Sequence, residues 1–179
     1  VHDLGLAEVA RIDAEMTAIL ATQAQLRSGE TPAQALSRLA KDPRFLYPNT
    51  DEGRKAALAD YTRMIEDQLA RSRAVIGLVP KALIEVKRVP EFKEKNAPGA
   101  YYFPPALDGT RPGVFYANLR NMNELTKFGM RTLALHEGVP GHHFQIALAH
   151  EQDGGPTFRK VLPFTAYGEG WALYAEWLG

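Results

Sequence analysis

The chain has 179 residues, 45% hydrophobic and 23% charged, which excludes wholesale disorder and suffices for one domain or two small ones. Its 21 basic and 21 acidic residues cancel to a net charge of 0, so no electrostatic feature favours a nucleic-acid partner or a polybasic membrane-surface protein. Without cysteine, any metal has to be held by His, Asp and Glu. No apolar run approaches the roughly 20 residues of a membrane-spanning helix, so we expect no membrane contact from this segment itself.

Residues 1–80 are predicted to form a helical segment. Apolar residues recur at helical spacing from Leu6 to about Leu26, which predicts an amphipathic helix. Thr31 followed by Pro32 is typical of a helix start, so a short helix should begin there. A third, long helix is predicted over 51–79, with Pro80 ending it.

Residues 81–179 are predicted to combine a small sheet with the helices that carry the chemistry. The stretch 84–89 alternates at period two, and 101–103 and 114–116 are rich in aromatic and β-branched residues. Proline and glycine separate these stretches, so we expect a small antiparallel sheet over 84–119. The predicted fold class is mainly α with a small antiparallel β-sheet (α+β).

The segment from Asn121 to Glu124 fits a capping box and predicts the start of a helix. The inward face of this helix is predicted to carry Leu125, Phe128, Gly129, Thr132, Leu133 and His136. Gly138 to Gly141 should interrupt the helix, a second helix should run over 142–150, and a last one should begin near Thr165.

Four of the five histidines lie between positions 136 and 150. A lone His on an apolar helical face is more often a hydrogen-bonded core residue than a ligand. Here Glu137 and two further histidines, His142 and His143, follow His136 within seven positions, and this density favours a metal site.

The relevant comparison is with His-Glu-x-x-His, in which one helical face presents two imidazoles and the Glu acts as general base. Four residues after His136 the chain has Pro140, which costs roughly 3 kcal/mol inside a helix. If Pro140 and Gly141 loop out, His142 is the second ligand. If the helix continues, His143 lies about 20° round from His136 and is the ligand instead. We favour His142, because Pro-Gly indicates an interruption.

A catalytic zinc usually takes a third protein ligand and an open water position. Glu169 and Glu176 are seven residues apart and share a face with Ala172 and Leu173, an apolar setting in which an unpaired carboxylate is costly. Metal coordination would offset that cost. The alternative is a solvent-facing pair on an ordinary amphipathic helix.

Three ordered motifs carry a family resemblance. They read His136-Glu-Gly-Val-Pro-Gly-His-His-Phe-Gln145, then Glu169-Gly-Trp-Ala-Leu-Tyr-Ala-Glu176, preceded by Tyr101-Tyr102-x-Pro104-Pro105-x-Leu-Asp108-Gly109-x-Arg111-Pro112-Gly113-x-Phe115-Tyr116-x-Asn118. Together they closely resemble the bacterial domain of unknown function 885 family, which looks like a divergent branch of the gluzincin zinc peptidases of clan MA. The resemblance covers essentially the whole chain.

The resemblance implies a partial zincin-like metallopeptidase core that binds Zn²⁺. The implied metal ligands are His136, a second His for which we take His142, and Glu169, with Glu137 as general base. His143 and Tyr167 are further catalytic candidates, Tyr101, Tyr102 and Arg111 are candidates for substrate binding, and Glu176 is expected to support a ligand from behind. Family members are typically much longer and often exported or lipid-anchored, so we expect this chain to be part of a longer protein that activity requires.

The expected function is zinc-dependent hydrolysis of a peptide or peptide-like substrate. Tyr101 to Phe103 would supply an edge strand for an extended peptide, although packing is the commoner role of such tyrosines. Arg111 would receive a substrate carboxylate unless it is simply solvated. Two alternatives stay open: a non-catalytic metal-binding or structural lipoprotein module, and a zinc hydrolase of a non-peptide amide or ester.

Overall fold

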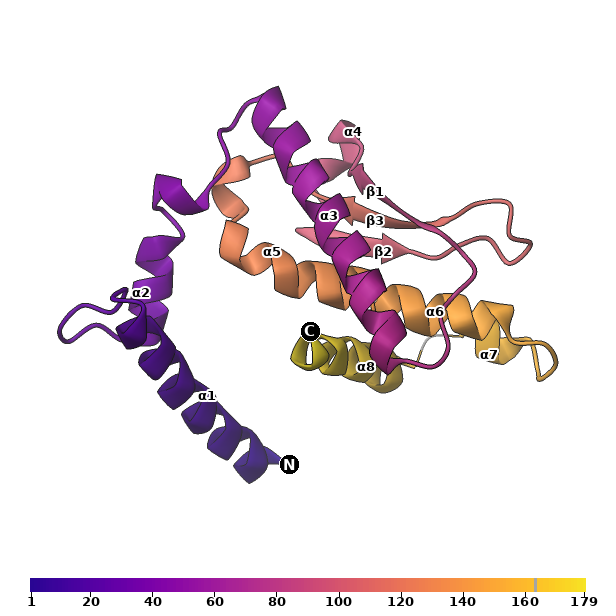
Figure 1. Cartoon of the computed structure of the whole chain (residues 1–179), viewed down its shortest axis with the longest axis horizontal. Coiled ribbons are helices and arrows are strands. Elements are labelled where there is room, and N and C mark those ends of the chain that lie inside the picture. Colours follow the sequence, from indigo (N-terminus) through magenta and orange to yellow (C-terminus); the bar gives the residue numbers. More distant parts are fainter. Residues whose placement is uncertain (163) are drawn as a thin grey trace. The chain divides into compact units, whose positions relative to one another are not determined.

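A computed structural model describes residues 1–162 and 164–179 of the chain (Figure 1). The structure divides into two compact units, Val1–Leu46 and Tyr47–Gly179, so the division falls after residue 46 and not after residue 80. The reason is that the long helix of the first eighty residues packs on the sheet of the second unit. Among the described residues, no helix has the length and apolar character needed to span a membrane.

The first unit contains helices α1 (His2–Thr22) and α2 (Pro32–Leu39) and a 3₁₀ turn at Pro43–Phe45. Helix α1 ends four residues before the predicted limit. Helix α2 begins as predicted, because the Thr31 side chain accepts a hydrogen bond from the Gln34 amide in a complete capping box. The small core of this unit consists of Leu20, Ala35 and Leu39, with Leu26, Leu36 and Phe45 packed against it.

The second unit contains all the candidate site residues. Its helices and strands are α3 (Asp51–Val75), β1 (Ile84–Arg88), α4 (Glu91–Glu94), β2 (Ala100–Phe103), β3 (Gly113–Ala117), α5 (Lys127–Leu133), α6 (His142–Glu151), α7 (Phe158–Val161) and α8 (Thr165–Leu178). The Thr50 side chain caps α3 by accepting from the Gly53 amide. Helix α3 ends at Val75, so the predicted extension to residue 79 is wrong.

The sheet is mixed, and the predicted antiparallel sheet is therefore only half right. Strand β3 lies in the middle, pairing in parallel with β1 and antiparallel with β2, with Val86 opposite Phe115 and Phe115 opposite Tyr102. Period-two alternation identifies the face that each strand buries but not the direction of its neighbour. The direction is set here by the chain reversal at α4, which carries β2 to the far side of β3.

The helix expected from Asn121 starts later than predicted. The Asn121 side chain accepts from the Asn123 amide and caps only a 3₁₀ turn, Met122–Glu124, while α5 begins at Lys127. As a result the buried face is not the predicted one. Met130 and Ala134 are fully buried, whereas Phe128, Gly129 and Thr132 of the predicted inward face are exposed.

The core of the second unit lies between α3, the sheet and the α5 segment. Tyr61 of α3 packs on Phe115 of β3, with ring centroids 4.8 Å apart. Gly138 lies against Ile65 of α3, close enough that an added Cβ would meet the Ile65 side chain at 3.1 Å. Helices α5 and α6 follow one another along one side of the sheet, and α8 lies beside α6 (Figure 1). This packing places the His136 segment next to β2.

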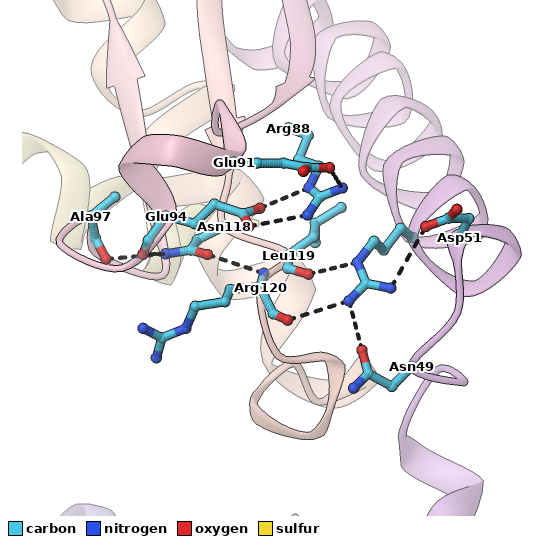
Figure 2. A network of polar contacts seen from close by, with 10 residues as sticks. Asn49, Asp51, Arg88, Glu91, Glu94, Ala97, Asn118, Leu119 and Arg120 are labelled. Atoms are coloured by element: carbon cyan, nitrogen blue, oxygen red, sulfur yellow. Dashed lines mark hydrogen bonds and ion pairs between the residues drawn. The ribbon is translucent and has the colours of Figure 1, made fainter.

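A polar network ties the end of the sheet remote from the histidines to α3 (Figure 2). The Asn118 side-chain amide donates to the carbonyls of Glu94 and Ala97, at 2.8 and 3.1 Å. Arg54 of α3 donates to the Leu119 carbonyl at 2.9 Å and to Asn49 at 2.7 Å. Side chains thus satisfy the backbone carbonyls at the turns where regular pairing ends.

Arg88 of β1 completes this network with two carboxylates of very different exposure. It donates to both oxygens of Glu94, at 2.7 and 3.0 Å, and to Glu91 at 2.8 Å (Figure 2). The side chain of Glu94 is 4% exposed and that of Glu91 is 78% exposed. The hydrogen bonds from Arg88 lower the pKa of the Glu94 carboxyl, although burial raises it in part.

We predict that Glu94→Gln lowers the free energy of unfolding by about 2 kcal/mol, because it leaves a half-buried guanidinium without its buried counter-charge. The matched change Glu91→Gln removes an exposed partner of the same arginine and should cost less than about 0.5 kcal/mol. Because folding lowers the pKa of Glu94, its ionised carboxylate contributes to the free energy of unfolding at pH values above the unfolded-state pKa. This contribution is lost as the pH falls through the folded-state pKa. Urea denaturation at neutral and acidic pH measures the free energy of unfolding of the parent and of both variants. Equal losses in Glu94→Gln and Glu91→Gln at neutral pH would contradict the prediction.

Candidate metal centre

The helix that carries His136 is interrupted where the sequence predicts. After α5 the chain forms a π-helical segment, Ala134–Gly138, and then a turn with a cis Val139–Pro140 bond before α6 begins at His142. Pro140 has no N–H to donate, and the Gly141 amide binds the Leu135 carbonyl instead, at 3.0 Å. The extra residues are thereby accommodated, and the rings of His136 and His142 meet edge to face with centroids 5.0 Å apart.

Two contacts hold this turn. Gly141 approaches the preceding helix so closely that an added Cβ would clash with the backbone carbonyls of Leu135 and His136. Trp171 of α8 donates its indole N–H to the carbonyls of Pro140 and Gly141, at 2.8 and 3.1 Å. The sequence analysis assigns no role to Trp171. Its place in the motif after Gly168 and Gly170 is the only sequence signal for this contact.

His136, His142 and Glu169 come together at this point. One ligand atom from each of these side chains lies within 4.8 Å of the other two. The two oxygens of Glu169 divide between the rings, with Oε2 at 3.2 Å from His136 Nε2 and Oε1 at 3.7 Å from His142 Nε2. Glu169 is half exposed, so the cluster opens to solvent on one side.

Glu176 follows Glu169 on α8 and contacts the other ring nitrogen of His136. His136 Nδ1 lies 2.6 Å from Glu176 Oε1, so both ring nitrogens of His136 face carboxylates. A neutral imidazole has only one N–H and can satisfy one of them. A cation between Nε2 and Glu169 would satisfy the other, and His136, His142 and Glu169 form the donor set that catalytic zinc prefers.

Glu137 lies beside this cluster without belonging to it. Its Oε2 is 4.0 Å from His142 Nε2 and accepts a hydrogen bond of 3.0 Å from the backbone amide of Tyr102. Burial raises the pKa of the Glu137 carboxyl, while the nearby His136 and the Tyr102 amide lower it in part. Burial also lowers the pKa of the His142 imidazole, which favours the neutral form that a metal ligand needs.

His143 lies outside the cluster. Its ring is 2% exposed, and its Nδ1 is 2.9 Å from the Tyr102 hydroxyl. The structure thus pairs these two site candidates with each other, and the catalytic role expected for His143 stays a prediction. The backbone of Tyr102, and not its side chain, faces the candidate site.

The remaining sequence candidates are not among the three ligands. Tyr101 stacks on Tyr116 with centroids 5.0 Å apart. The Arg111 guanidinium lies over the Phe103 ring at 4.4 Å and donates to the adjacent carbonyl of Pro112 at 3.1 Å. Tyr167 is 70% exposed, and its backbone carbonyl accepts from the Gln145 side chain at 3.0 Å.

We predict that Gly141→Ala destabilises the protein by about 3 kcal/mol or more, because the new methyl group collides with backbone that cannot move independently. Zinc binding should be lost with it, since the same turn places His142. Gly170→Ala is the control, because nothing lies within 4 Å of an added Cβ there, and its effect should stay within about 1 kcal/mol. Thermal denaturation and metal analysis check both variants. Tolerance of Ala at both positions would refute the close approach.

Comparisons with known proteins give the family of the chain and a solved structure with the same fold. The model of the family described as "Bacterial protein of unknown function (DUF885)" matches residues 1–179. No curated protein matches the chain. The crystal structure of "the putative lipoprotein from Colwellia psychrerythraea" superimposes with a TM-score of 0.94 at 41% identity, covering 99% of this chain. This chain spans 30% of the length of that one. The chain belongs to the bacterial DUF885 family.

Proposed function

We propose that this chain carries the zinc-binding and catalytic residues of a peptide hydrolase with a partial zincin-like core. The observation that supports this most is the convergence of His136, His142 and Glu169, with a second carboxylate, that of Glu137, beside them and outside the ligand set. A purely structural metal site has no need of that extra group, whereas a hydrolase needs a base.

The residues of the chain fit the metal. His136 and His142 would bind through Nε2 and Glu169 through a carboxylate oxygen, since these atoms already face one another. When bound, zinc supplies Lewis acidity that lowers the pKa of a coordinated water towards about 7 and polarises a substrate carbonyl. Catalytic zinc sites with three protein ligands keep a position open for water, and His136, His142 and Glu169 would be those three ligands.

Glu137 would act as the general base and then as the acid. Its carboxylate stands 4.0 Å from a ligand nitrogen, near enough to accept the proton of a water at the centre. The same carboxyl would then pass that proton to the leaving amine. The Tyr102 amide fixes the orientation of the carboxylate through Oε2.

Strand β2 would align an extended peptide. It is an edge strand of the sheet, and the Tyr102 amide points away from β3 because it binds Glu137. In an antiparallel pair the N–H and C=O of one residue point the same way and alternate along the strand. The backbone groups of Ala100 and the Tyr102 carbonyl therefore lie on the side of β2 away from β3, next to the base, where a substrate strand would add by main-chain hydrogen bonds while the Tyr102 amide holds Glu137.

We predict that Glu137→Gln leaves zinc content nearly intact but lowers hydrolysis by about 10² to 10⁴, because it removes the base without removing a ligand. His136→Ala should lose zinc and hydrolysis together, because two ligands rarely retain a catalytic metal. The measurements are metal analysis of the full-length protein and digestion of a peptide library followed by mass spectrometry.

The contrast between these two variants decides the proposal. If Glu137→Gln keeps full turnover on a substrate whose cleavage depends on added zinc, Glu137 is not the base. If the parent protein binds zinc and cleaves no peptide, amide or ester, the chain is a metal-binding module.

We also predict that Glu176→Gln lowers zinc affinity by about tenfold to a hundredfold, because its carboxylate orients His136 and raises the basicity of the ligating nitrogen. Competition with a chelator measures the affinity. Asp67→Asn, an exposed carboxylate on α3, is the control. Equal affinities in the two variants would show that Glu176 does not support the ligand.

A further inference from the structure

The buried His143 and the partly buried Tyr102 form a pair that the proposed chemistry does not use. The Tyr102 hydroxyl lies 2.9 Å from His143 Nδ1, and the rings meet edge to face with centroids 5.6 Å apart. His143 directly follows the candidate ligand His142 on α6. The backbone amide of Tyr102 holds Glu137 at 3.0 Å. One residue pair thus links the helix of a metal ligand to the strand that orients the base.

The protonation states give this link a direction. Burial raises the pKa of the Tyr102 hydroxyl far above its usual range, so the hydroxyl keeps its proton at pH 7 and can donate it. The hydroxyl donates and Nδ1 accepts, which leaves the proton on Nε2.

Gly113 of β3 makes room for the pair. A Cβ at this position would collide with the Tyr102 hydroxyl and lie 3.0 Å from His143 Nδ1. The Gly113 amide also donates to the Leu83 carbonyl at 2.9 Å, next to Ala82. The central strand, the edge strand, α6 and the segment before β1 therefore all lie close to the hydrogen bond between Tyr102 and His143.

We propose that Tyr102 and His143 are positioning residues: their hydrogen bond fixes edge strand β2 and the Glu137 carboxylate relative to the metal-ligating end of α6. This inference rests on the proposed function, because it assigns the pair a task in that site. Neither side chain touches the metal or the substrate. The pair instead holds the Tyr102 amide where Glu137 needs it.

Amide hydrogen exchange of the segment 100–103 in the full-length protein tests the idea without any substrate. Tyr102→Phe should accelerate exchange of the position-102 amide about tenfold, because the strand loses its anchor and the bond to Glu137 opens more often. Tyr101→Phe, one residue away on the same strand with its ring on Tyr116, should change the rate by less than about twofold. Glu137→Ala deletes the acceptor and sets the upper limit. Equal rates in the two tyrosine variants would overturn the proposal.

A double variant separates positioning from simple packing. Tyr102→Phe with His143→Leu removes both polar partners, so thermal stability should recover towards the parent while exchange at position 102 stays fast. If protection returns together with stability, the pair is only a packing element and the proposal is wrong. This variant carries the test if Tyr102→Phe alone does not fold.

A kinetic test of Tyr102→Phe depends on the proposed function. On any peptide that the parent cleaves, Tyr102→Phe should lower kcat about tenfold with KM and zinc content nearly unchanged, and an unchanged kcat would overturn the positioning role. A parent that cleaves nothing overturns the hydrolase proposal alone, since the exchange measurements stand without turnover.

Discussion

The close backbone approach at Gly141 is the constraint on which the candidate site depends. A proline four residues after His136 prevents an uninterrupted helix, so the Leu135 carbonyl takes its hydrogen bond from Gly141 across a π-helical segment and a tight turn. Only a residue without Cβ fits there. The turn brings His142 next to His136, and the indole N–H of Trp171 stabilises it by donating to the Pro140 carbonyl.

Electrostatics then explain why this point suits a cation. Three carboxylates, Glu137, Glu169 and Glu176, gather around two imidazoles in a chain whose overall charge is zero. Negative charge is therefore concentrated locally and not balanced by lysine or arginine in the contacts described. The three carboxylates also differ in what surrounds them. Glu169 is half exposed at the opening, Glu176 is bound to His136 Nδ1, and Glu137 is held by a backbone amide.

Several elements could be predicted from the sequence because their signals are local. The cap at Thr31, the interruption after Gly138 and the gathering of apolar residues in three strands each depend on neighbouring residues, and all are present. The sequence does not predict the start of α5, because the Asn121 side chain can cap a 3₁₀ turn as well as a helix. The direction of β1 was missed because alternation reports burial and carries no information about a partner strand.

The sequence by itself determined which residue types are available for metal chemistry, and the proline and glycine that force His142 out of the helix of His136. Only the tertiary structure decided their roles, because a role depends on what lies opposite a side chain across the fold. His143 and Tyr102 look like site residues in the sequence, yet they meet each other behind the site. The amide that orients Glu137 comes from a strand 35 residues earlier in the chain, and no spacing rule relates the two.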